Sequence, residues 1–283
     1  MNYKLYDCKI EKILIENQEL LYLLEDKNDP LSFYLKLGDK LNEKGKISDS
    51  YYCFKKAYKL RANSSDDIKA KISICLSSLA LKLNRNNEAY KILLEVLNND
   101  LYVSSYKKSK LILNYILVLK KLKRFDEALD NILFFESNFG VSTINLFNLL
   151  TLKANILKEK GFSKNAVEIH KLLFDSSSNP EEKLVACCNM LSIYLEGSNL
   201  GKLKEYVEIV EDLTYDYRYC ENKLYEADIY FSLFHYYRFI KIPKKADKFY
   251  RLAYLSAVAN NNYMIAESCI NSCFYINTKL KLS

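Results

Sequence analysis

Apolar side chains recur at intervals of three and four residues along most of the chain, which is the spacing of one face of an α-helix. The first such stretch covers residues 3–26, and its apolar positions are Leu5, Ile10, Ile13, Leu14, Leu20, Leu21 and Leu24. Asn28, Asp29 and Pro30 follow it, a combination typical of one helix ending and another starting. The pattern therefore predicts a single amphipathic helix ahead of Pro30.

The next stretch, from Tyr34 to Ala57, predicts two antiparallel helices joined by a tight turn at Gly45. Small residues on the facing sides would let the two backbones approach closely, and larger ones would fill the space around them. The small positions are Gly38, Ser50 and Ala57, and the larger ones are Tyr34, Leu41 and Phe54. We interpret this segment as one structural unit.

The unit recurs at a near-constant interval. The small residue of its second helix falls at Ser50, Ala89, Ala128, Ala166, Leu203 and Ala246, of which Leu203 is the weakest match. Successive members are 39, 39, 38, 37 and 43 residues apart. Gly, Pro, Asn and Ser gather between the periodic segments, where turns are needed. Such a period is typical of stacked helix pairs.

The segment from Tyr34 to Ala57 resembles a tetratricopeptide (TPR) repeat, whose pattern runs from an aromatic residue through Leu-Gly to Ala, Phe and Ala in the second helix. The resemblance implies an all-α fold: a right-handed superhelix of about six TPR-like pairs and about fourteen helices in all. Residues 1–30 would form an N-terminal capping helix, residues 31–261 six repeats, and residues 262–283 a C-terminal capping helix and tail. The caps are expected because the outer apolar faces of a stack need cover.

Composition supports long helices and narrows the function classes. The 283 residues include only 6 Gly and 3 Pro, too few for a fold rich in strands and turns. No glycine-rich phosphate loop, dinucleotide fingerprint, HExxH or GxSxG motif occurs. The two histidines lie in separate repeats, so neither a zinc site nor a histidine-based triad has a candidate. We therefore expect no enzyme, no catalytic residue, no metal and no cofactor.

The N-terminus and the cysteines suggest a cellular setting. The first residues lack the apolar core of a signal peptide, and no apolar run approaches the ~18 residues that a membrane span needs. None of the 8 cysteines forms a Cys-x-x-Cys pair, and most fall on apolar helix faces, so free thiols are expected. Cys269 and Cys273, one helical turn apart, leave a shared metal as the alternative. We predict a cytoplasmic protein that does not bind a membrane.

The charge balance bears on partners. A net charge of +7 mildly favours an acidic partner. The densest basic run, Lys120 to Arg124, is expected to be a solvated helix end, with a phosphate-binding patch as the alternative. We expect no direct binding of nucleic acid, and a homodimer remains open.

The first helices of TPR-like pairs line a concave groove. Residues about 18, 15, 14, 11 and 8 positions before the small residue of the second helix face it. Asn114, Asn189 and, one period further on, Asn271 share one of these columns, and Asn155 lies in another. A carboxamide carries a donor and an acceptor, so it can hold a peptide backbone. In TPR proteins that bind peptides, Asn residues in these columns have that role.

The resemblance therefore implies a peptide-binding set drawn from the groove columns, although a merely polar helix face is the alternative reading. Its members are Lys110, Leu113, Asn114, Leu117, Thr151, Asn155, Asn189, Phe231, His235, Arg238 and Asn271. The same columns also contain Lys120, Asn148, Leu152, Lys158, Val185, Cys188, Ser192, Leu195, Asp228 and Ser232. In this set the cations would pair with an acidic group and the apolar residues would contact ligand side chains.

Repeat length and groove asparagines resemble the intracellular peptide-pheromone receptors of Gram-positive bacteria, the Rap, NprR, PlcR and Rgg group, over about residues 31–277. That resemblance implies a groove for a short linear signalling peptide. The output modules of the group, a helix-turn-helix or a three-helix bundle, are not evident. The expected function is a non-enzymatic peptide sensor or the ligand domain of a regulator. The alternative is an adaptor or assembly scaffold that binds a folded partner.

Overall fold

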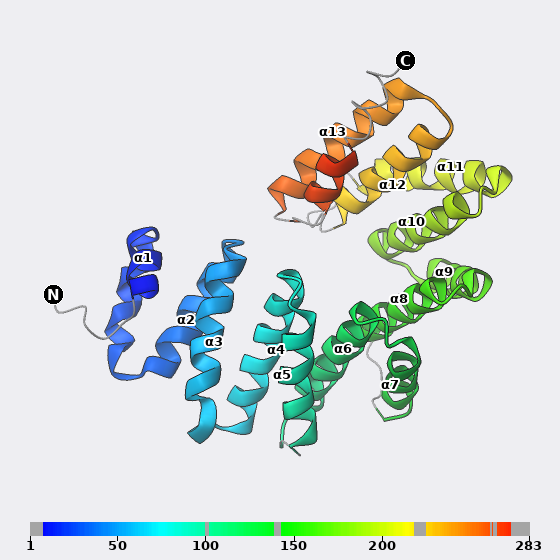
Figure 1. The fold of residues 1–283 in the computed structure, drawn as a ribbon. Coiled ribbons are helices and arrows are strands. Elements are labelled where there is room, and N and C mark those ends of the chain that lie inside the picture. The colour runs from blue at the N-terminus through cyan, green and yellow to red at the C-terminus, as the bar shows by residue number, and fades with distance from the viewer. Residues whose placement is uncertain are drawn as a thin grey trace. The chain divides into compact units, whose positions relative to one another are not determined.

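The computed structural model describes residues 8–99, 102–138, 143–217, 225–260, 262 and 265–272. Over these residues the chain is almost entirely helical and contains no strand (Figure 1). It divides into two compact units, residues 1–140 and residues 141–283. The predicted all-α fold is confirmed.

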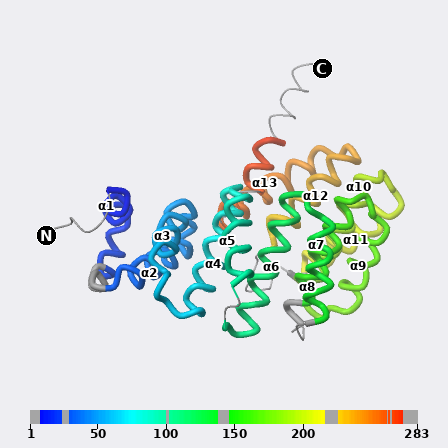
Figure 2. Tube along the Cα trace, turned by 60° about the horizontal axis from the view of Figure 1, so that its bottom comes forward, coloured from blue at the N-terminus to red at the C-terminus, as the bar shows by residue number. Residues whose placement is uncertain are grey.

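Unit 1 contains α1 to α7 and two short 3-10 segments. Their bounds are α1 Cys8–Ile15, η1 Gln18–Asn28, α2 Pro30–Glu43, α3 Ile47–Leu60, η2 Arg61–Asn63, α4 Asp66–Lys82, α5 Asn86–Asn98, α6 Ser105–Lys121 and α7 Phe125–Asn138. Helices adjacent in sequence pack as pairs, α2 with α3, α4 with α5 and α6 with α7 (Figure 2). α4 also contacts α6, so first helices of successive pairs are neighbours.

Unit 2 repeats the arrangement with three further pairs. Their bounds are α8 Thr143–Glu159, α9 Ser163–Ser176, α10 Pro180–Glu196, α11 Leu200–Tyr217, α12 Glu226–Phe239 and α13 Pro243–Ala259. The first helix α10 contacts both α8 and α12. Residues 265–272 are also helical. The six predicted pairs are therefore all present.

The predicted single helix over residues 3–26 is wrong in one respect, because the helix breaks at Asn17. α1 ends at Ile15, and the buried Asn17 side chain donates from Nδ2 to the carbonyl of Ile13 at 2.6 Å. The Asn17 carbonyl then accepts the Leu20 N–H at 2.8 Å, and a 3-10 segment follows. A short carboxamide that bonds the backbone competes with the helix's own ladder. The change of register leaves Leu21 exposed.

All six small positions are buried, as expected of contact points between paired helices. Ser50, Ala89, Ala128, Ala166 and Leu203 have no exposed surface, and Ala246 is 8% exposed. In the first pair, Ser50 Oγ donates to the carbonyl of Gly38 at 2.8 Å. A Cβ at Gly38 would lie 2.8 Å from the ring of Phe54, so the close approach there requires glycine.

All six turns within pairs share one backbone conformation. The residue five positions before each small residue has positive φ: Gly45 71°, Asn84 57°, Lys123 59°, Gly161 90°, Ser198 53° and Lys241 58°. The residue after it donates its N–H to a carbonyl five residues back, as Lys46 does to Leu41 at 2.9 Å. This is the Schellman motif, which satisfies the carbonyls left over at a helix end. The common turn keeps every pair in the same register.

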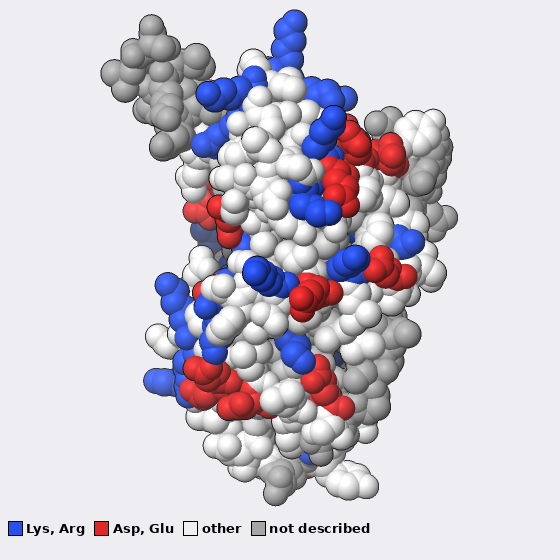
Figure 3. Space-filling view, turned by 90° about the vertical axis from the view of Figure 1, so that its right-hand side faces the viewer, with Lys and Arg blue, Asp and Glu red and all other residues white. Residues whose placement is uncertain are grey.

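The core of unit 2 holds α10 and α12 in place. Leu191 of α10, Leu203 of α11, Leu233 and Phe234 of α12 and Phe249 of α13 are buried in one cluster. The opposite faces of α10 and α12 are left partly exposed. On the face drawn in Figure 3, Lys and Arg side chains lie interspersed with Asp and Glu. None of the described helices is both long and apolar enough to cross a membrane.

Candidate binding site

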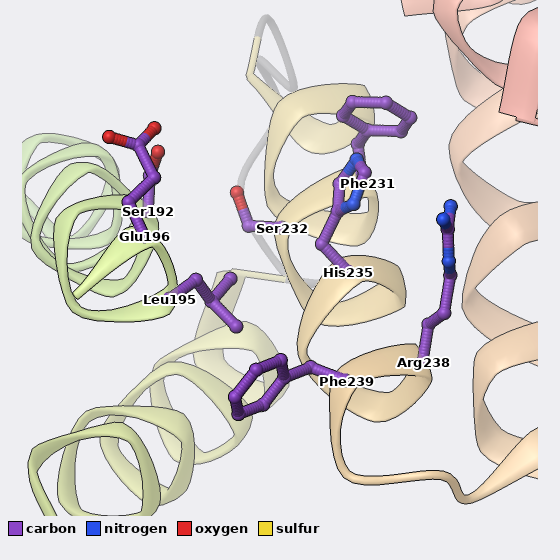
Figure 4. A pocket seen from close by; sticks show the side chains of 8 residues that line it. All are labelled: Ser192, Leu195, Glu196, Phe231, Ser232, His235, Arg238 and Phe239. Atoms are coloured by element: carbon purple, nitrogen blue, oxygen red, sulfur yellow. The ribbon is translucent and has the colours of Figure 1, made fainter. Parts of the chain in front are cut away.

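Unit 2 contains an open pocket of about 510 Å³ between α10 and α12 (Figure 4). It is lined by Ser192, Leu195, Glu196, Phe231, Ser232, His235, Arg238 and Phe239. The first three belong to α10 and the others to α12. The volume lies within the range of ordinary ligand pockets.

The repeat register explains why these residues converge. Counted from the small residue of the following helix, both helices contribute positions 11, 8 and 7 before it. These are Ser192, Leu195 and Glu196 on α10, and His235, Arg238 and Phe239 on α12. Phe231 and Ser232 lie one turn earlier on α12. The pocket is therefore formed by the same face of two neighbouring first helices.

Aromatic rings form most of the α12 wall. Phe231 and His235 pack edge to face, with ring centroids 4.4 Å apart, and Phe234 lies 5.0 Å from His235. Burial, together with the charge of Arg238, holds the pKa of His235 below its ordinary value, so the imidazole is neutral at neutral pH. Leu195 and Phe239 point toward one another across the pocket (Figure 4). A ligand would meet apolar surface here.

The polar groups lie around this apolar centre. Lys158 of α8 donates to Ser192 Oγ at 2.9 Å and pairs with Glu196 at 2.7 Å. The charge of Glu196 is therefore partly compensated, and these two contacts of Lys158 join α8 to α10. Ser232 Oγ donates to the carbonyl of Asp228 at 2.9 Å, which leaves its oxygen able to accept. The exposed guanidinium of Arg238 supplies positive charge at the α12 side.

The structure brings together three residues of the predicted set, Phe231, His235 and Arg238, in this pocket. Asn189 lies on α10, one turn before Ser192, and is half-buried. Thr151 and Asn155 lie on the adjacent α8, and the hydroxyl oxygen of Thr151 is buried without a hydrogen-bond partner. Asn271 is exposed in the helical residues 265–272.

The other four predicted residues, Lys110, Leu113, Asn114 and Leu117, lie on α6 of unit 1. Asn114 Nδ2 contacts two acceptors on α4, the carbonyl of Ile74 and Ser77 Oγ, each at 3.2 Å. Asn114 therefore joins two first helices, a role that its column alone did not predict. The ammonium group of Lys110 lies 4.4 Å from the ring centroid of Tyr106.

Five lining residues are absent from the predicted set. Ser192, Leu195 and Ser232 occupy the expected columns but were not selected, and Glu196 and Phe239 lie one residue beyond the last column. Glu196 and Phe239 can be identified from their position relative to the small residue. The pocket-lining side of a first helix extends to the residue seven positions before the small residue, where the chain enters the turn.

The described residues contain no group of three or more His, Cys, Asp or Glu side chains that could hold a metal ion. The six cysteines among them, Cys8, Cys53, Cys75, Cys187, Cys188 and Cys269, are free thiols. Burial raises the pKa of Cys187 to about 12, so this thiol is unreactive. Cys220 and Cys273 lie outside the described residues, so the alternative of a metal shared by Cys269 and Cys273 falls partly outside them.

No protein-family model and no curated protein matches the sequence. Among solved structures, the chain is similar to BtubC (BKLC) from P. vanneervenii, with a TM-score of 0.55, 14% identity, and 77% of this chain and 95% of that chain covered. PilF of Pseudomonas aeruginosa matches with a TM-score of 0.49, 14% identity and coverage of 84% and 97%. YrrB, a TPR protein with an unusual peptide-binding site, matches with a TM-score of 0.45, 16% identity and coverage of 70% and 93%. At such identity the likeness to BtubC supports the helical fold alone.

Proposed function

We propose that the chain is a non-enzymatic binding protein and that the α10–α12 pocket takes one side chain of a linear peptide. The observation that carries this proposal is the pocket's composition. Leu195, Phe231 and Phe239 offer apolar contact, and Arg238 offers a cation beside them. An apolar or aromatic side chain with a nearby acidic group is the complementary ligand.

The neighbouring columns supply partners for the peptide backbone. Asn189 on α10 and Asn155 on α8 occupy the predicted groove columns of two first helices that contact each other. Each carboxamide can accept one backbone N–H and donate to one carbonyl. An extended peptide that enters the pocket with one side chain would run along these two residues.

The finer part of the proposal concerns biological role. By resemblance to the intracellular pheromone receptors, the peptide is a signalling ligand and the chain is a cytoplasmic sensor or the ligand domain of a regulator. The alternative is an adaptor or scaffold whose partner is a folded protein. The two roles differ in what binds and in which residues the binding requires.

The test begins with a phage-displayed library of random octapeptides, selected on the full chain. Selected peptides are synthesised and titrated by calorimetry into the wild type and two variants, Asn189→Ala and Arg238→Gln. Loss of the Asn189 carboxamide leaves peptide groups unpaired and should weaken binding by about five- to 150-fold, or about 1–3 kcal/mol. Replacing an acidic peptide residue by its amide should weaken binding to the wild type but not to Arg238→Gln.

Matched controls carry the same chemical changes away from the pocket. Asn165→Ala lies on the exposed side of α9, and Arg251→Gln lies on α13, where Arg251 pairs with Asp247. Both should bind the selected peptides as the wild type does. Peptides that bind all variants equally would refute the pocket assignment. A folded protein that co-purifies stably and ignores the pocket variants would support the adaptor role instead.

A further inference from the structure

Unit 1 contains a second pocket whose lining is mainly cationic. Its volume is about 300 Å³, and it is lined by Lys9, Ser48, Tyr51, Tyr52, Lys55, Lys56, Lys59 and Arg85. Six of these residues belong to α3, while Lys9 comes from α1 and Arg85 immediately precedes α5. The pocket takes no residue from the first helices α2, α4 and α6. It therefore lies apart from the groove columns and belongs to neither the peptide site nor its support.

Two tyrosine rings hold the cations in place. The ammonium groups of Lys9 and Lys56 lie 4.3 and 5.4 Å from the ring centroid of Tyr52. Lys55 and Arg85 lie 5.5 and 4.7 Å from that of Tyr51. The electron-rich faces of the rings attract the cations and offset their mutual repulsion. This is how several positive charges can share a small volume.

The charge of this pocket is not balanced by its own lining, which contains five cations and no acidic side chain. Glu88, outside the lining, pairs with Lys55 at 2.8 Å and lies 3.7 Å from Arg85. Lys55 and Arg85 therefore share one carboxylate, which comes from outside the lining. On the face that Figure 3 draws, by contrast, positive and negative side chains are mixed.

We propose that this pocket binds the adjacent phosphates of a small polyphosphorylated ligand. Several lysine point charges and one guanidinium favour an anion with more than one negative charge, such as a phosphate group with a charge near −2. The volume, at the lower end of ligand pockets, suits a compact anion. Because cations already lie against both rings, base stacking, the usual contribution of aromatic residues to binding single-stranded nucleic acid, is disfavoured here.

The test uses inorganic tripolyphosphate as the probe, titrated by calorimetry into the full chain at physiological salt. We expect saturable binding of one tripolyphosphate per chain. The double substitution Lys56→Gln with Lys59→Gln should weaken it by about tenfold or more, because two of five cations are lost. The matched control, Lys82→Gln with Lys91→Gln, removes the same charge from exposed positions of unit 1 outside the pocket and should change affinity less than about twofold.

Three results would overturn the proposal: no saturable binding, an equal loss in the control variant, or tighter pocket-dependent binding of a twelve-nucleotide thymidine strand than of tripolyphosphate. Melting temperatures are measured in parallel. If the double variant does not fold, the single variant Lys59→Gln, at an exposed position, is compared with the wild type instead. Because the pocket lies in unit 1, failure here leaves the peptide proposal for unit 2 unaffected, and the peptide titrations test that proposal separately.

Discussion

His170 is a buried titratable group that neither proposed site uses. It lies on α9 with no exposed surface, and neither ring nitrogen has a hydrogen-bond partner. Burial, assisted by the charge of Lys158, lowers the pKa of His170 to about 4 from an ordinary value of 6.5. The imidazole is therefore neutral in the folded protein over the whole range in which the unfolded chain would take up a proton.

This difference in pKa between the folded and the unfolded state predicts how the stability of the protein changes with pH. Between about pH 6.5 and 4 the unfolded state binds more protons at His170, so stability should fall as pH falls through that window. From pH 7 to pH 4.5 the contribution of this residue is about 2–3 kcal/mol. His170→Leu should remove it and, at pH 7, be at least as stable as the wild type, since two unpaired polar atoms leave the core. Urea unfolding of both proteins at the two pH values measures this, and identical pH dependence would contradict it.

At the residue scale, the sequence pattern indicates which side of a helix lines the pocket better than it indicates the individual lining residues. The offset from Ala246 selects Phe231, His235 and Arg238, and all three line the pocket. An offset within one pair fixes direction around a helix, but it contains no information on the neighbouring pair. For this reason the contact of Asn114 with α4 could not be predicted, because it depends on how successive pairs stack.

At the element scale, the six left-handed turn residues show how far the local sequence predicts backbone conformation. Gly45 and Gly161 are glycines, the residue expected at such a position, and Asn84 is a tolerated substitute. Lys123, Ser198 and Lys241 give no local signal. Their conformation follows from the period alone, because each lies five residues before its small residue. The repeat register thus predicts turn geometry where composition does not.

These turns yield a prediction. At Lys123 a side chain is held at a φ of 59°, where glycine is the less strained residue. Lys123→Gly should therefore raise the free energy of unfolding by about 0.5–1 kcal/mol, net of the added freedom of the unfolded chain. The control is Lys121→Gly, exposed and helical two positions earlier, which should lower it by about 1 kcal/mol. Chemical denaturation measures both, and a loss of stability in Lys123→Gly would count against the turn assignment.

The N-terminal segment contains a second feature of this scale that the sequence pattern does not predict, the break in its helix. Its apolar spacing continues past Asn17, so the pattern alone favours an unbroken helix. The break arises because Asn17 is buried, and a buried carboxamide must bond a backbone group. Burial is a property of the packed array and is not visible in the spacing.

At the scale of the whole molecule, the fold was predictable because it is a repeat. Each pair contacts chiefly its neighbours, so one recognised unit and a constant period determine the class and the number of pairs. The ends of such an array lack one neighbour. Ile10, Ile13, Leu14, Leu20 and Leu23 of α1 and η1 cover this face in unit 1, packing in one cluster with Phe33 and Leu37 of α2.

The last prediction tests whether this segment acts as a cap. Deletion of residues 1–28 should expose the faces of Phe33 and Leu37, at a cost of roughly 3–6 kcal/mol from these two side chains alone. Each pair in a repeat array is stabilised by contacts with its neighbours. Hydrogen exchange should therefore accelerate most in α2 and α3 and progressively less in α4 and α5. A control deletion of residues 1–7, upstream of the five apolar side chains, should leave exchange in α2 and α3 unchanged. Equal protection of α2 and α3 in both deletions would show that the first pair is stable without cover, and the capping role would then be wrong.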